Sequence, residues 1–100
     1  MNKEIEIAHT IKDSEGIFEA REKGIKVGEL TYWLQGEKCM VINHTEVNEK
    51  RKGRGIARLL VEAAVLHAKK KSYQILPKCS YVKVVFDRVA EYQELLYKGE

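Results

Sequence analysis

Two hydrophobic patterns meet at one stretch of this sequence, Asn48-Glu49-Lys50-Arg51-Lys52-Gly53-Arg54-Gly55-Ile56-Ala57. Before this stretch the apolar residues alternate with polar ones, which is typical of β-strands. After it they recur at steps of three and four residues, as on one face of an α-helix. The sequence therefore predicts a sheet followed by a helix, joined by a basic turn that contains two glycines.

The first half of the chain is expected to form four strands. In the third of them, Leu30, Tyr32 and Leu34 alternate with Thr31 and Trp33, so the two sets face opposite sides of a sheet. The turns between the strands are short and contain glycine, which favours an antiparallel meander. The expected strands are residues 4–12, 17–22, 26–35 and 39–47, separated by turns at 13–16, 23–24 and 36–38.

The second half is expected to be mainly helical. A long amphipathic helix runs from Gly55 to about Lys71 and is followed by a short buried strand at 74–78. A helix at 81–89, with Ser80 as its N-cap, and a second helical segment at 91–96 complete the chain. The predicted fold class is α+β, with a mixed sheet, a long helix on the sheet and helices at the C-terminus.

Length and composition define the broad class of protein. A chain of 100 residues fits one domain, here residues 1–100, and 44% hydrophobic residues suffice for a core. We expect no membrane segment, because no apolar run approaches about 18 residues, and Met1–Glu6 does not resemble a secretory signal. The spacing of Cys39 and Cys79 fits neither a metal motif nor a disulfide framework, so we expect reduced thiols and a cytoplasmic location.

The basic turn has the chemistry of an anion site. Gly53 and Gly55 allow close approach of the backbone, and the first N–H groups of the following helix favour an anion. The cations Lys50, Arg51, Lys52, Arg54 and Arg58 would strengthen such contacts. A Walker loop is excluded because its Gly-Lys-Ser/Thr sequence is absent, and a dinucleotide fold is excluded because four meandering strands precede the helix.

The motif Lys52-x-x-Gly55-x-Ala57 resembles the Q/R-x-x-G-x-G/A acetyl-CoA motif of the GNAT superfamily, with Lys in place of Gln or Arg. The resemblance extends from about Leu30 to Leu96 and is to a compact single-domain subgroup. It implies that the fourth and fifth strands splay apart to admit the pantetheine arm of acetyl-CoA, and it implies no metal. The implied cofactor-binding residues are Val47, Lys52, Gly53, Arg54, Gly55, Ile56 and Ala57.

By the same resemblance, the activity is transfer of an acetyl group from acetyl-CoA to an acceptor. The acceptor is expected to be an amine and is not identified by the sequence. Larger relatives build part of their acceptor pocket from a helical pair between the first two strands, and no such pair is readable here.

Four residues are candidates for the chemistry. Cys79, just before a helix, would have its thiolate favoured by the helix dipole and could carry an acyl group. In direct transfer His44 or Glu46 would act as general base and Tyr81 as proton donor to the departing thiolate. A regular fourth strand would place Ile42, His44 and Glu46 on one face, whereas a bulge would change this assignment.

Two other functions remain open. The chain could be a CoA-binding or acyl-carrying protein with little turnover, which the minimal N-terminal half suggests. A nucleic-acid module built on the basic cluster is disfavoured, because the net charge is only +3 and no zinc, recognition-helix or stacking-aromatic signature accompanies the cations.

Overall fold

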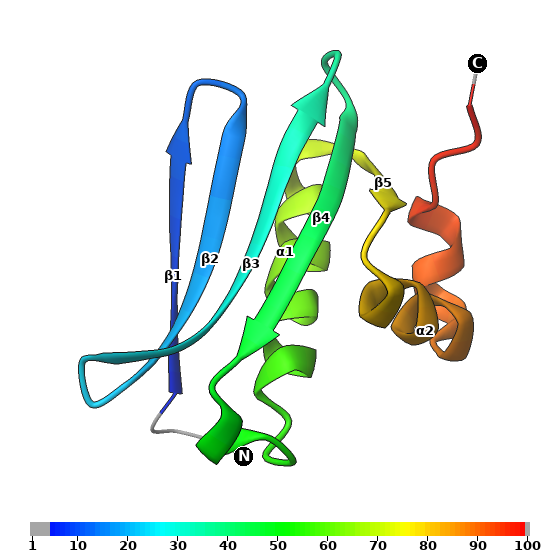
Figure 1. Ribbon diagram of the computed structural model, residues 1–100. Coiled ribbons are helices and arrows are strands. Elements are labelled where there is room, and N and C mark those ends of the chain that lie inside the picture. The colour runs from blue at the N-terminus through cyan, green and yellow to red at the C-terminus, as the bar shows by residue number, and fades with distance from the viewer. Residues whose placement is uncertain (1–4, 100) are drawn as a thin grey trace.

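The computed structural model describes residues 5–99, and they form one mixed sheet with helices beside it (Figure 1). Glu4, expected to begin the first strand, lies outside the described residues, as do the other residues before Ile5. The strands are β1 (Ile5–Lys12), β2 (Glu15–Glu22), β3 (Ile25–Gln35), β4 (Cys39–Val47) and β5 (Gln74–Pro77). The helices are α1 (Ile56–Lys71) and α2 (Ser80–Arg88), with 3-10 helices η1 (Glu49–Arg51) and η2 (Ala90–Leu95).

The sheet has the order β1-β2-β3-β4-β5, with antiparallel pairing up to β4 and parallel pairing of β4 with β5. The meander and the predicted fold class are thus confirmed, and α1 makes the crossover to β5. The first turn is shorter than expected. Glu15 and Gly16 already pair with Lys12 and Ile11, so β2 begins at Glu15 and the turn is limited to residues 13–14.

The core lies between α1 and the sheet. One face of α1 is buried, and its residues pack in one cluster with Phe18, Leu30, Tyr32 and Ile42 of the strands. Figure 1 shows α1 lying along the sheet behind β3 and β4. The buried residues of α1 are Ile56, Leu60, Val61, Ala64, Val65 and Ala68.

The C-terminal elements pack beside β5 (Figure 1). The prediction that Ser80 caps α2 is wrong: Cys79 occupies the N-cap with extended backbone, and Ser80 is already in the helix. Cys79 stays extended because its N–H donates to the carbonyl of Ile42 at 3.3 Å. The predicted last helical segment is η2, after which Leu96 bridges to Ile75. Among residues 5–99 no helix has the length and apolar character needed to cross a membrane.

Candidate functional site

An opening begins where β4 and β5 part. Their parallel pairing runs from Cys39 with Gln74 to Ile42 with Pro77, and it ends there. The N–H groups of Lys78 and Cys79 both donate to the Ile42 carbonyl, at 2.9 and 3.3 Å, so the chain turns out of the sheet at this point. The rest of β4, up to Val47, therefore continues beyond the end of its partner.

A β-bulge at Asn43 decides which side chains of β4 face the opening. Thr31 of β3 pairs with His44 and Tyr32 with Ile42, so Asn43 is an inserted residue. Ile42 is buried in the core, whereas His44 is exposed on the opposite face. The expectation for a regular strand, with Ile42, His44 and Glu46 on one face, is therefore corrected. His44 and Glu46 remain together on the face that points away from α1.

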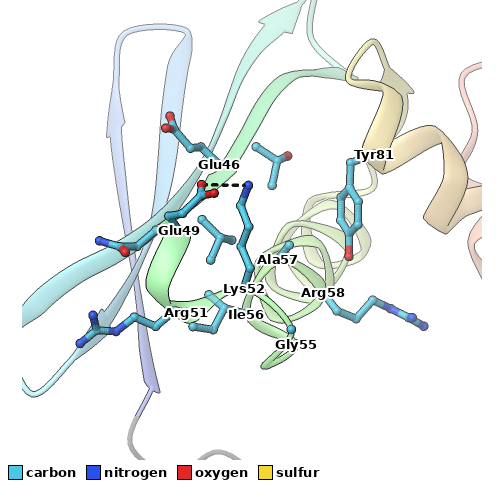
Figure 2. Close-up of a pocket in the computed structure, with 13 residues that line it drawn as sticks. Glu46, Glu49, Arg51, Lys52, Gly55, Ile56, Ala57, Arg58 and Tyr81 are labelled. Atoms are coloured by element: carbon cyan, nitrogen blue, oxygen red, sulfur yellow. Dashed lines mark ion pairs between the residues drawn. The ribbon is translucent and has the colours of Figure 1, made fainter.

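A cleft of about 860 Å³ lies between the end of β4, the basic turn, the start of α1 and the start of α2. Figure 2 shows Tyr81 of α2 and Ala57 of α1 on its two walls, with Lys52 reaching in from the turn. The structure brings all the predicted cofactor residues except Arg54 to this cleft, namely Val47, Lys52, Gly53, Gly55, Ile56 and Ala57. The predicted catalytic residue Glu46 also lines it.

The basic turn has a backbone that suits close approach of a ligand. Gly53 and Gly55 have φ angles of +87° and +80°, a conformation that residues with a Cβ rarely adopt. Gly55 is the N-cap of α1, with no side-chain cap hydrogen bond in the described structure and no acidic residue in the first turn of the helix. The first N–H groups of α1 are thus available for an anion in the cleft.

The turn is attached to the sheet through Glu22, at the end of β2. The Glu22 carboxylate accepts hydrogen bonds from Arg51 Nε at 3.1 Å and from Arg54 Nη2 at 2.8 Å. Hydrogen bonds from Arg54 first, and then from Arg51, lower the pKa of Glu22 to about 2. Arg54, predicted as a cofactor residue, therefore binds Glu22 and does not line the cleft.

His44 and Glu46 form a small polar cluster with Glu29 of β3. His44 Nε2 lies 3.3 Å from Glu46 Oε1 and 3.6 Å from Glu29 Oε2. Glu29 and Glu46 are direct partners in the β3–β4 register, so the paired backbones hold the cluster. Such a chain of a histidine and carboxylates can accept a proton and pass it to solvent.

Cys79 lies at the point where the two strands part, but it is not among the residues that line the cleft. It is a half-buried free thiol, and its carbonyl accepts the Lys83 N–H at 3.0 Å as α2 begins. The position at a helix N-terminus is as predicted. The bond to Ile42 places its backbone next to the bulge.

Tyr81 and Thr45 also line the cleft, from its walls. Tyr81, considered in the sequence as a proton donor, enters from the first turn of α2. Thr45 was not identified from the sequence, and its Oγ1 atom is buried without a hydrogen-bond partner. The alternation of β4 places Thr45 on the face of Leu30 once the bulge is known, but the sequence contains no signal for that bulge.

The fold and cleft define a class of protein in which two parallel strands part beside the N-terminus of a helix that follows a glycine turn. A model of the GCN5-related N-acetyl-transferase family matches residues 17–95, and the chain belongs to this family. Among curated proteins no sequence matches it significantly.

Solved structures show the same fold. A GCN5-like N-acetyltransferase candidate from Staphylococcus aureus matches with a TM-score of 0.69 and 23% identity, over 98% of this chain and 93% of that one. A GNAT family acetyltransferase from Elizabethkingia anophelis, solved with acetyl-CoA bound, matches with a TM-score of 0.66 and 17% identity. The match covers 75% of this chain and 65% of that one. The ribosomal-protein-alanine N-acetyltransferase of Brucella melitensis matches with a TM-score of 0.62 and 19% identity, over 89% of this chain and 66% of that one. This chain thus spans slightly less than two thirds of the last two proteins.

Proposed function

We propose that this protein binds acetyl-CoA in the cleft and transfers its acetyl group to an amine. The observation that carries the proposal is that one cleft contains both the N-terminus of α1 with its glycine turn and the half of β4 that lies beyond its pairing with β5. Membership of the N-acetyltransferase family supports it, as does the acetyl-CoA bound to the Elizabethkingia structure.

The turn would bind the pyrophosphate of CoA. Main-chain N–H groups at Gly55, Ile56 and Ala57 supply donors, and Lys52 and Arg58 line the same cleft as cations. The side chains of Lys52 and Arg58 are 63% and 46% exposed, so they can turn toward a phosphate at little cost. The pantetheine arm would then extend along β4 toward the point where β4 and β5 part.

Direct transfer is the mechanism that the cleft-lining residues support best. The amine nitrogen attacks the thioester carbonyl, the C–S bond breaks, and the CoA thiolate leaves. Glu46, with His44 beside it, would remove the proton from the amine. Tyr81 would give its phenolic proton to the thiolate and regain one from solvent.

Relay through Cys79 is the alternative mechanism. Its thiolate would attack the thioester, so that a C–S bond to Cys79 forms as the C–S bond to CoA breaks and the CoA thiolate leaves. The amine would then attack the acetyl group on Cys79, forming the C–N bond as the Cys79 thiolate leaves and the amine proton is lost to a base. Cys79 adjoins Ile42 at the point where β4 and β5 part, which supports a position close to the thioester. An acetyl group that remains on the protein after denaturation, and is lost in Cys79→Ala, would identify the relay.

The acceptor would approach the face of the sheet that points away from α1, where His44 and Glu46 lie. In this chain β1 and β2 form a direct hairpin, so no helical pair covers that face between them. An open face suits an amine on a larger molecule as well as a small one. A ribosomal protein is the acceptor named for one relative, and another is an aminoglycoside acetyltransferase with sisomicin bound. We place the reaction in the cytoplasm, in accord with two free cysteines.

Calorimetric titration with CoA, followed by acceptor-dependent release of CoA thiol, tests the proposal. We expect saturable binding of CoA and thiol release with at least one amine from a panel of polyamines, amino acids and basic peptides. Binding without release for any amine would favour the acyl-carrying alternative. Absence of CoA binding would refute both. Nucleic-acid binding that falls steeply with salt would instead favour the basic module.

A further inference from the structure

Thr45 lines the cleft, and its hydroxyl oxygen is buried without a hydrogen-bond partner. Among residues 5–99, its Oγ1 is the single buried side-chain oxygen or nitrogen without a hydrogen-bond partner. A buried polar group left without a partner destabilises a fold, and such groups are rare in native proteins. Valine has almost the same shape and would avoid this cost, so the folded chain alone gives no reason for threonine here.

The position of Thr45 along β4 indicates what its partner is. Thr45 lines the cleft two residues before Val47, which adjoins the basic turn, and three residues after Ile42, where pairing with β5 ends. At about 3.3 Å per residue, it lies roughly 7 Å along the strand from Val47. If the pyrophosphate binds the turn and the thioester reaches the point where β4 and β5 part, as the proposed function requires, the middle of the pantetheine arm passes Thr45.

The middle of that arm contains two amide groups, each with a carbonyl oxygen. We propose that the Thr45 hydroxyl donates a hydrogen bond to one of these carbonyls and so holds the thioester near the point where β4 and β5 part. The inference rests on the proposed function, because it needs the arm to lie along β4. A change of χ1 to another staggered rotamer moves Oγ1 to the position that the methyl group or Hβ now occupies, so the hydroxyl can change direction without movement of the backbone.

This assignment separates binding from stability. If the hydroxyl serves the fold, its removal should lower the free energy of unfolding of the free protein. If the hydroxyl finds a hydrogen-bond partner only in the ligand, its removal should lower the affinity for CoA, while the free protein keeps or gains stability. Thr45→Val removes the hydroxyl and preserves the shape, and Thr45→Ser preserves the hydroxyl. Thr10→Val, on β1 and away from the cleft, is the matched control.

The test measures the Kd of CoA and of adenosine 3′,5′-bisphosphate by calorimetry, together with the Tm of each free variant. The bisphosphate carries the adenosine end of CoA without the pantetheine arm. We expect Thr45→Val to weaken CoA about tenfold, with unchanged bisphosphate binding and an equal or higher Tm. Thr45→Ser should stay within about threefold of the wild type, as should Thr10→Val.

Three results would overturn the inference. Equal CoA affinity in the wild type and Thr45→Val would show that Thr45 does not form the proposed hydrogen bond with CoA. The proposed function would be unaffected by that result. Equal weakening of both ligands, or a lower Tm, would assign Thr45 to the fold or the turn. If the wild type bound no CoA, the proposed function itself would fail, and with it the arm that Thr45 is said to bind.

Discussion

Arg54 Nη2 lies 2.8 Å from Glu22 Oε2, although the two residues are far apart in the sequence. Glu22 is at the end of β2 and is 9% exposed, the buried charged residue of the described core. Arg51 completes the site at 3.1 Å. Because both arginines come from the turn that forms the cleft, this contact holds the turn against the sheet before any ligand binds.

Glu22 should make stability depend on acid. The pKa of Glu22 is about 2 in the folded protein, below the ordinary value of 4.5. Folding therefore stabilises the ionised form of this carboxyl group relative to the protonated form. The resulting stability is fully present above pH 4.5 and is lost as the pH falls from 4.5 toward 2. Glu22→Gln should be less stable at neutral pH and should lose less of its Tm over this range. Parallel Tm profiles for the two proteins would contradict this role, and Glu37→Gln, in the β3–β4 turn, serves as the control.

Gly55 should be required for both the turn and the ligand. Its φ of +80° strains any residue with a Cβ by about 1–2 kcal/mol, although no atom lies within 4 Å of an added Cβ. Gly36, in the β3–β4 turn, has a φ of +69° and equally open space. Gly55→Ala and Gly36→Ala should therefore lower Tm by similar amounts, whereas Gly55→Ala alone should weaken CoA binding, by tenfold or more. Equal CoA affinity in the two variants would show that the turn at Gly55 is not part of the CoA-binding site.

The strands and the long helix could be predicted from the sequence because their side chains alternate or recur strongly. Cys39–Val47 and the end of α1 at Lys71 fall where the pattern predicts them. The sequence also located the glycine turn, since positive φ and a helix N-terminus are local properties. The structure shows that the turn lines a cleft, which no local pattern could establish.

The contacts that the sequence did not reveal depend on tertiary structure. The bulge at Asn43 follows from the register of β3 against β4, and it moves Thr45 to the cleft face. Arg54 was assigned to the ligand because its charge lies in the motif, but a carboxylate from β2 pairs with it. Ser80 is a good capping residue, yet the bond from Cys79 to Ile42 starts α2 one residue earlier than Ser80 would as N-cap.

Tyr81 and Glu46 should affect the rate of transfer more than substrate binding. Under direct transfer, Tyr81→Phe removes the proton donor and Glu46→Gln removes the base, so each should lower kcat by about 10²-fold with little change in the KM for acetyl-CoA. Tyr73→Phe, in the ring cluster away from the cleft, is the control. Steady-state rates over a range of acetyl-CoA and amine concentrations provide the measurement, because they separate kcat from KM. An unchanged kcat in Tyr81→Phe would assign thiolate protonation to solvent.

The histidines at the other end of α1 should make stability fall below neutral pH. His9 stacks on Phe18 at 4.0 Å and lies 4.4 Å from the His67 ring, with its Nε2 atom 2.7 Å from the Tyr32 hydroxyl. Burial, and then the neighbouring His67, lower the pKa of His9 below 6.5, and burial followed by Lys71 and Lys70 does the same for His67. Because the folded pKa values are depressed, the folded state resists protonation of these two histidines.

The stability that the neutral histidines contribute is fully present above pH 6.5 and decreases as the pH falls below that value. The Tm of the wild type should therefore drop as the pH is lowered through this range, and His9→Leu should reduce the drop. His44→Gln, which changes an exposed histidine, should retain it. A His9→Leu profile with the full wild-type drop would show that the acid sensitivity originates elsewhere.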